Sequence, residues 1–476
     1  MTLPDGYSLD TVANSSMGPD TELEVGGVNV RSDDTVLVST RHGELWAYDP
    51  ASEEWTLKTG SLHQTLGVWT EDDSEDIWVV QKPELTRLVD DTEGPEIDLY
   101  EKVNAGWGIS GDYHEFAFGP VRDSEGNFHL NLNLGAEGGY GPCTGVMQYS
   151  APYRGYHVKV TPDGEFIPYA NGLRSPTGIG INGDDEVFYT DNQGDWVPVC
   201  HVAHVTEGSF HGHPHSLAGD PDFPDLQGLC QSDADAETYL EERKPPVAWI
   251  PYNVQTSSGG ITFDKEGNFG PFQGQAFFGD QENGNILRIA MEEVNGSYQG
   301  FAVPFTDVAD LQCGTIREEF TNDGSTMYLG QTNRGWGSVG NEPYGVQRIS
   351  YDGETTPFAI HSVEIMESGF RVNFTKPAAG EAGTPDSYDL SRWTYNYFSS
   401  YGSGRVNETG VDATGASVVD GGSAVELDLP SVGPADVSGT RTVQGRVYQI
   451  TANVSADDGS ELAHNTGWYT VNDTPN

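Results

Sequence analysis

One pattern recurs six times in the first three quarters of the chain. It consists of an apolar strand, a turn of Asp, Gly or Asn, a second strand rich in β-branched and aromatic residues, a polar or glycine break, and a third strand. The copies begin near residues 28, 66, 115, 178, 259 and 318. One copy alone exposes an apolar face, and closure into a ring buries it. The repeat therefore predicts an all-β, six-bladed β-propeller with a central channel.

The repeat stops after about residue 358, where a different alternation begins. In the segment HSVEIMESGFRVNFTKPAAG, the side chains of Phe370, Val372 and Phe374 share one face of a strand. A later segment, RVYQITANV (446–454), alternates in the same way. We expect a propeller over residues 1–358 and a β-sandwich of the immunoglobulin or fibronectin kind over residues 359–476.

Charge limits the partners of this chain. Asp and Glu number 73 against 23 Lys and Arg, seven of them Lys, and the formal net charge is −50. Nucleic acid and anionic membranes are poor partners for such a surface. With 11% aromatic residues the chain is expected to fold despite this charge. An acidic, Lys-poor coat is typical of proteins from high-salt organisms, so we expect a halophilic, haloarchaeal or similar, origin.

The location and the redox state of the protein stay open at this stage. No apolar run approaches the length of a membrane span, and Met1 leads almost directly into a strand-like segment. Six glycosylation-type triplets, the first at Asn14, favour an extracellular or cell-surface location over a cytoplasmic one. Four cysteines (Cys143, Cys200, Cys230 and Cys313) fit no CxxC pair, so disulfides and free thiols are both expected alternatives.

Polar residues directly follow the second strand of every copy. Because the blades are radially equivalent, these residues should meet at one mouth of the channel and form a polar pocket there. Hydrophilic connections without a ligand are the alternative. The predicted ring consists of Arg41, His42, Gln81, Lys82, Asn133, Asp191, Asn192, Gln193, Gly194, Asp280, Gln281, Glu282, Asn333 and Arg334.

Two segments in the middle of the chain carry a family resemblance. NGLRSPTGIGINGDDEVFYTDNQGDW (171–196) and GSFHGHPHSLAG (208–219) resemble the core signature of the glucose/sorbosone dehydrogenases, sugar dehydrogenases that use pyrroloquinoline quinone (PQQ). GDYHEFAFG (111–119), QKPELTRL (81–88) and NRGWGSVGNEPYGVQRI (333–349) are similar to motifs of planctomycete propeller proteins described as membrane-bound dehydrogenases. The resemblance implies a secreted, carbohydrate-active oxidoreductase with its site at the mouth.

The resemblance also implies residues for the cofactor site. Arg174 would lie against the quinone, although it could instead order the turn before Pro176. Gln193, Gly194 and Asp195 occupy the position that supplies oxygen ligands to calcium. The remaining cofactor-binding candidates are Gln64, which resembles a glutamine near the substrate, together with Arg317 and Arg334.

A base is needed to remove a hydroxyl proton during sugar oxidation, and an imidazole suits that role. His114 is the candidate, with the adjacent Glu115, and a structural hydrogen-bonding role is the alternative. Imidazole and carboxylate groups also suit a divalent metal. The further metal candidates are Asp191, Asp280, Glu282 and His213, the last within a segment that holds five histidines at positions 201–215; a solvated, merely His-rich loop is the alternative.

Departures from the family pattern keep three functions open. Glu282 stands where the family has a quinone-contacting Lys, a pair of arginines is reduced to Arg317, and PQQ carries three carboxylates that need cations. The first function is a PQQ-dependent sugar dehydrogenase. The second is a metal-dependent lyase or hydrolase acting on a sugar, uronide or lactone. The third is a non-catalytic carbohydrate-binding or scaffold protein.

Overall fold

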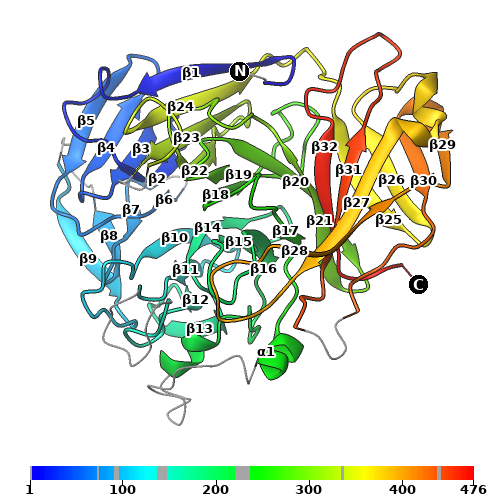
Figure 1. The fold of residues 1–476 in the computed structure, drawn as a ribbon. Helices are drawn as coiled ribbons and strands as arrows, with labels where there is room; N and C mark the ends of the chain where they lie inside the picture. The colour runs from blue at the N-terminus through cyan, green and yellow to red at the C-terminus, as the bar shows by residue number, and fades with distance from the viewer. Residues whose placement is uncertain are drawn as a thin grey trace.

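Strands dominate the computed structural model, which describes residues 3–71, 74–89, 96–136, 147–219, 236–333, 337–436 and 441–475. Six four-stranded blades surround a central channel, and a β-sandwich stands beside the ring (Figure 1). The innermost strands of neighbouring blades contact each other around the whole ring. The predicted all-β class and the count of six blades are confirmed.

Blades 1 to 5 are each built from four consecutive strands, with the first strand innermost. Blade 1 consists of β2 (Val25–Val30), β3 (Val36–Thr40), β4 (Leu45–Asp49) and β5 (Glu54–Thr59). Blade 2 consists of β6 (Val68–Thr70), β7 (Ile77–Val80), β8 (Leu85–Val89) and β9 (Leu99–Asn104). Blade 3 consists of β10 (Ala117–Arg122), β11 (Phe128–Leu132), β12 (Tyr156–Val160) and β13 (Phe166–Asn171).

Blades 4 and 5 follow the same order. Blade 4 consists of β14 (Pro176–Ile181), β15 (Val187–Asp191), β16 (His201–His204) and β17 (Ala248–Trp249). Blade 5 consists of β18 (Ser258–Phe263), β19 (Ala276–Asp280), β20 (Ile286–Val294) and β21 (Ser297–Pro304). A long insertion between β16 and β17 carries the 3₁₀ helix η1 (Pro214–Gly219) and the helix α1 (Ala236–Glu242).

The first strand of the chain closes the ring. β22 (Thr315–Phe320), β23 (Thr326–Thr332) and β24 (Tyr344–Tyr351) form blade 6, and β1 (Tyr7–Ala13) pairs antiparallel with β24 as its outer strand. The Tyr7 hydroxyl donates to the carbonyl oxygen of Phe269, 2.7 Å away in blade 5. The first strand of the chain thereby completes the last blade and closes the ring.

Corresponding positions of the innermost strands hold glycine in five blades. These residues are Gly27, Gly67, Gly119, Gly178 and Gly260. A Cβ added to Gly67 would overlap the carbonyl oxygen of Gly119, so the inner strands approach more closely than a side chain allows. In blade 6 the corresponding residue is Arg317, which makes the channel chemically asymmetric.

The C-terminal part is a sandwich of two sheets. One sheet contains β25 (Ile360–Met366), β26 (Gly369–Phe374), β30 (Ala424–Asp428) and β29 (Gly415–Val419). The other contains β32 (Thr466–Val471), β31 (Arg446–Ala452), β27 (Tyr388–Tyr395) and β28 (Arg405–Val411). Short 3₁₀ helices are η4 (Gly380–Gly383), η5 (Pro385–Ser387) and η6 (Asp420–Gly422). The predicted face of Phe370, Val372 and Phe374 is buried between the sheets.

The sandwich is continuous with the propeller. β32 pairs with β21, the outer strand of blade 5, so that the two four-stranded sheets form one eight-stranded sheet. Phe301 and Val303 of β21 belong to the same apolar core as the sandwich residues. This shared sheet fixes the sandwich beside blade 5, an arrangement that the repeat pattern did not predict.

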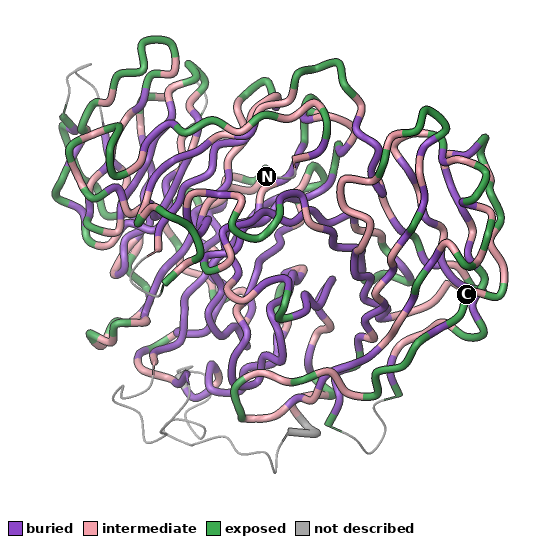
Figure 2. Tube along the Cα trace, turned by 45° about the horizontal axis from the view of Figure 1, so that its top comes forward, coloured by how far each residue is buried: buried purple, intermediate pink, exposed green. Residues whose placement is uncertain are grey.

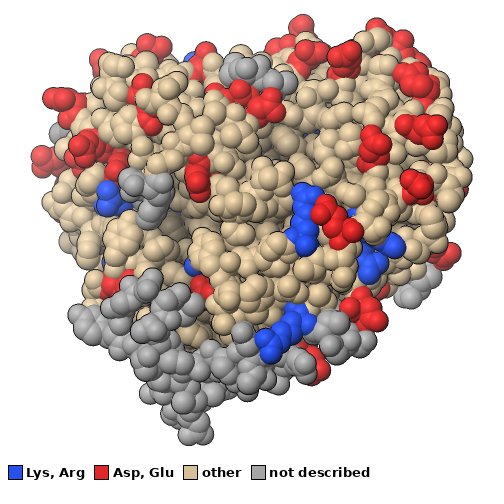
Figure 3. Space-filling model, in the orientation of Figure 1, with Lys and Arg blue, Asp and Glu red and all other residues tan. Residues whose placement is uncertain are grey.

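Buried, exposed and charged residues occupy different parts of the molecule. Buried residues line the inner strands, whereas exposed ones concentrate in the peripheral loops (Figure 2). On the face shown in Figure 3, most carboxylates lie along the upper and right-hand parts of the molecule, and a smaller group of basic and acidic side chains lies right of the centre. None of the helices in the described ranges has the length and apolar character that a membrane span requires.

Candidate functional site

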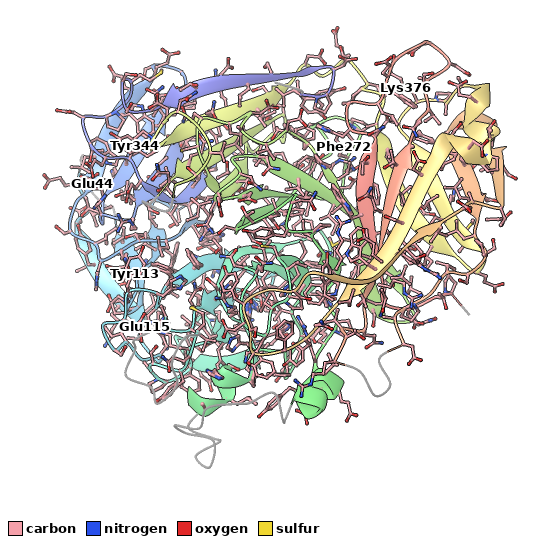
Figure 4. All side chains as sticks on the ribbon, in the orientation of Figure 1. Glu44, Tyr113, Glu115, Phe272, Tyr344 and Lys376 are labelled. Atoms are coloured by element: carbon pink, nitrogen blue, oxygen red, sulfur yellow. The ribbon has the colours of Figure 1, made fainter. Side chains whose placement is uncertain are left out.

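The predicted mouth is built by two sets of connections. The segment before the first strand and the segment after the second strand of each blade leave at the same end of the sheet, because the strands are antiparallel. Glu44, Tyr113, Glu115 and Tyr344, labelled in Figure 4, belong to these connections or adjoin them in blades 1, 3 and 6. The connections after the second strands of the blades therefore lie at one common end of the channel.

A buried network of three charged or ionisable residues lies at the rim of blade 4. Nε of Arg174 donates to Oδ1 of Asp195 at 2.9 Å, and Nε2 of His213 lies 2.8 Å from Oδ2 of the same carboxylate. All three side chains are buried. Burial would raise the pKa of Asp195, but the charges of His213 and then Arg174 outweigh it and hold the pKa below its usual range. The structure thus joins three predicted site residues in one cluster.

The neighbouring carboxylate of Asp191 orders the backbone. It accepts the N–H groups of Arg174 at 2.8 Å, Ser175 at 2.7 Å and Asn192 at 2.8 Å. The side-chain amide of Gln193 donates to the carbonyl oxygen of Pro198 at 3.2 Å. Asp191 therefore holds the two loops of blade 4 together at the mouth.

Asp280 performs the same task in blade 5. It accepts the backbone N–H groups of Thr256 and Glu282, both at 2.7 Å, and of Asn283 at 2.9 Å. Burial raises its pKa to about 6. Glu282 itself is exposed. The two residues lie at the mouth as predicted, but the Asp280 oxygens are occupied by the protein backbone.

The two catalytic candidates of blade 3 differ in exposure. Glu115 is fully buried, and its carboxylate accepts the N–H and the hydroxyl of Ser110 at 2.8 and 2.7 Å. His114 is half-buried, its ring lies 5.0 Å from that of Phe116, and its backbone N–H donates to Asp112. Glu115 therefore fixes the loop, and His114 is the one of the pair at the surface of the mouth.

Two of the remaining cofactor candidates, Gln64 and Arg317, belong to blades other than that of Arg174. Gln64 adopts a left-handed backbone conformation with φ of 54°. Arg317 extends across the channel, where its Nη2 donates to the carbonyl oxygen of Leu66 at 2.9 Å and its Cζ lies 4.8 Å from the Phe118 ring centre. Arg334 lies outside the described residues. Arg317 therefore obstructs the channel below the mouth.

A cavity of about 820 Å³ occupies the opposite end of the channel. Its wall includes Gly27, Gly67, Gly119, Arg317, Glu318 and Glu319. Burial raises the pKa of Glu318 to about 8. Turn residues of the far end, including Ser32, Lys265 and Asn322, also line it, so the cavity lies away from the mouth; Arg317 is the predicted cofactor residue in its wall.

The histidine-rich segment is not a solvated loop. His201, His211, His213 and His215 are buried among blade 4 and the insertion. Among the described residues no group of three or more His, Cys, Asp and Glu side chains is arranged to hold a metal ion. Cys200 and Cys313 are buried free thiols, and Cys143 and Cys230 lie outside the described residues.

The residues described at the mouth do not suit PQQ. A quinone with three carboxylates needs available cations. Arg174 is paired with Asp195, Arg41 with Glu24, and Lys82 with the carbonyl oxygen of Asp112. Each of these cations already has an acceptor within the protein, so the described cation set does not fit the cofactor.

An arm from the sandwich covers Arg174, a contact that no sequence motif indicated. The segment 396–404 between β27 and β28 crosses the face of the propeller in Figure 1. Its Gly402 N–H donates to the carbonyl oxygen of Gly194 at 2.9 Å, and the Tyr401 ring lies 5.3 Å from Cζ of Arg174. The arm therefore forms one wall of the mouth.

Exposed apolar and aromatic side chains gather at the same end. Of the eleven large hydrophobic residues exposed in the described chain, seven belong to the mouth connections or the arm. They are Met17, Ile109, Tyr113, Tyr252, Val308, Val339 and Tyr401. Exposed aromatic side chains beside polar groups are typical of a recognition surface.

No model of a known protein family and no curated protein matches this sequence. Three solved propellers are similar in fold. A proposed oxidoreductase (glucose dehydrogenase) of Thermus thermophilus has a TM-score of 0.52 at 15% identity, covering 72% of this chain and 100% of its own. The PQQ-bound aldose sugar dehydrogenase of Streptomyces coelicolor has a TM-score of 0.50 at 12% identity, covering 73% and 99%. The PQQ domain of Coprinopsis cinerea pyranose dehydrogenase has a TM-score of 0.51 at 12% identity, covering 73% and 96%. At these identities the likeness shows the fold.

Proposed function

We propose that the protein is a carbohydrate-active enzyme of the sugar dehydrogenase type, and that it binds a neutral sugar at the mouth of the propeller. The observation that carries the proposal is the set of exposed tyrosines, Tyr113, Tyr252 and Tyr401, on three different mouth segments. Tyrosine rings pack against the C–H faces of sugars, and their hydroxyls bond to sugar hydroxyls. The shared propeller fold of solved aldose and pyranose dehydrogenases supports the same substrate class.

The half-buried imidazole of His114, beside Tyr113, is the group that we assign to proton transfer from a sugar hydroxyl. Arg174, held by Asp195 and covered by Tyr401, shapes the wall of the mouth. The proposal includes no bound PQQ, because Arg41, Lys82 and Arg174 at the mouth are already paired within the protein. Oxidation of the sugar carbinol releases a proton from oxygen, which His114 takes, and a hydride from carbon, which a soluble two-electron acceptor must take; the dye represents that acceptor in the assay.

The test measures binding and turnover separately. Sugar binding is followed by saturation-transfer NMR over a panel of aldoses and oligosaccharides. Turnover is followed by reduction of an artificial dye, with and without added PQQ and calcium. We expect binding of a neutral sugar and dye reduction that does not require PQQ.

Three results would contradict the proposal. Absence of binding across the whole panel would contradict a sugar-binding site at the mouth. New absorbance from an unsaturated product on a uronide polysaccharide, without dye reduction, would assign a lyase instead. Strict PQQ-dependent turnover would overturn the conclusion that the described cations do not fit the quinone.

A further inference from the structure

One buried arginine has no acceptor for its N–H groups among the described residues. Four arginines are buried in this part of the chain: Arg154, Arg174, Arg243 and Arg288. Arg154 donates to the carbonyl oxygens of Gly108 and Phe116, and Arg174 donates to Asp195. The Arg288 guanidinium donates to the side chain of Gln275 and to the carbonyl oxygens of Ile360 and His361. For Arg243, neither Nε nor Nη1 nor Nη2 has a hydrogen-bond partner within the described ranges.

Arg243 lies at the junction of three parts of the molecule. Its Cζ is 4.6 Å from the Trp249 ring centre in blade 4 and 5.5 Å from the Tyr397 ring centre in the arm. Gly212 of the insertion lies beside Nε, where an added Cβ would be 2.7 Å away. The aromatic rings attract the positive charge, but they accept few of the five N–H groups of the guanidinium.

The charge of Arg243 also lacks a counter-ion in the described part of the chain. The carboxylate that acts on it electrostatically is Asp191, whose oxygens are bonded to three backbone N–H groups. The nearby His201, whose ring centre is 5.2 Å from that of Trp249, also has an unpartnered ring nitrogen, Nδ1. Leaving a cation buried without acceptors costs several kcal/mol. The native protein must therefore supply an acceptor from outside the described chain.

We propose that a small inorganic anion, of the size and charge of chloride, binds to the guanidinium of Arg243 at this junction. The anion accepts the N–H groups that no described protein atom accepts, and it neutralises the buried charge. When bound, the anion stabilises the contact between the insertion, blade 4 and the arm, because residues of all three surround the guanidinium. A water molecule would accept hydrogen bonds but leave the charge uncompensated, which is why the geometry favours an anion.

Chloride is the probe for this site. The midpoint of thermal unfolding, Tm, is measured for the full chain in rising potassium chloride, with potassium methanesulfonate added so that the ionic strength stays constant. This constancy is required because salt screens the many surface carboxylates. An anion that binds the folded state raises Tm with its concentration. We expect a chloride-dependent rise in the wild type and its loss in Arg243→Met.

Arg288→Met is the matched control, since Arg288 is also buried but donates to protein acceptors through both terminal nitrogens. It should lower Tm while the chloride-dependent rise remains. If Arg243→Met does not fold, crystals of the wild type grown in bromide provide the second measurement, with an anomalous peak expected beside the guanidinium. A wild-type Tm that is identical in both salts, a rise that persists in Arg243→Met, or bromide crystals without that peak would overturn the proposal.

Discussion

The guanidinium Nε of Arg174 and the carboxylate Oδ1 of Asp195 are joined by a hydrogen bond of 2.9 Å within the buried rim of blade 4. The same carboxylate binds His213 through its other oxygen. Both carboxylate oxygens that could face a cofactor are thereby used within the protein. The arginine that the family resemblance places against a quinone is neutralised by a residue only 21 positions later in the chain.

Asp195→Asn is expected to lower the free energy of unfolding by about 3–5 kcal/mol at pH 7, because it leaves the buried Arg174 without its counter-charge. Chemical denaturation of both proteins measures this. Glu408→Gln, which breaks an exposed ion pair with Arg405, is the control and should cost under about 1 kcal/mol. Equal losses in the two variants would contradict a buried ion pair.

The loss of stability caused by Asp195→Asn is expected to depend on pH. The pKa of Asp195 is lower in the folded than in the unfolded protein, so its stabilising contribution is present above the unfolded pKa and is lost as the pH falls. The difference in unfolding free energy between wild type and Asp195→Asn should therefore shrink below about pH 4. Denaturation series at several pH values check this. A difference that stays constant down to about pH 2 would show that the carboxylate has no lowered pKa.

The fold could be predicted from the sequence because each blade repeats the same local pattern. Strand, turn and strand recur with apolar faces that only neighbouring copies can cover, as in residues 28–49 and 178–194. The closure by β1 and the pairing of β32 with β21 could not be predicted. Both join segments far apart in the chain, and strand pairing over such distances leaves no local signal.

The site was predicted less completely, for a physical reason. The position of Asp191 and Asp280 at the mouth followed from radial equivalence of the blades, and Asp195 was named through the family resemblance. Whether a carboxylate faces a ligand or binds backbone N–H groups depends on loop conformation, which residue type does not determine. The arm that carries Tyr397 and Tyr401 comes from another domain, so no motif near the mouth indicated it.

Gly67→Ala is expected to prevent stable folding or to lower Tm severely. The added Cβ would overlap the carbonyl oxygen of Gly119 on the neighbouring inner strand, and neither backbone can move without shifting its blade. Gly183→Ala is the control, since an added Cβ there meets nothing within 4 Å. Thermal unfolding of the two variants provides the comparison. A Gly67→Ala protein as stable as Gly183→Ala would mean that the inner strands are farther apart than described.

Glu318→Gln is expected to stabilise the protein at alkaline pH. Burial raises the folded pKa of Glu318 to about 8, so wild-type stability is full below the unfolded pKa and falls as the pH rises through about 8. Glutamine removes this loss, with a gain of at most about 5 kcal/mol at about pH 9 and little change at about pH 4. Tm measured across this range tests it. Curves of Tm against pH that run parallel for the wild type and Glu318→Gln would contradict a raised pKa of Glu318.

Tyr113→Ala and Tyr252→Ala are each expected to weaken sugar binding about tenfold, a loss of about 1.4 kcal/mol, because each removes an aromatic surface at the mouth. Both side chains are about half exposed, at 50% and 53%, so Tm should change little. Tyr100→Ala removes a tyrosine of 43% exposure from the outer strand β9, away from the mouth, and should leave affinity unchanged. Titration of each variant with the sugar, followed by NMR or calorimetry, measures these affinities. If Tyr100→Ala weakens binding as much as the mouth variants do, the sugar lies on the outer face of blade 2, and the mouth is not the binding site.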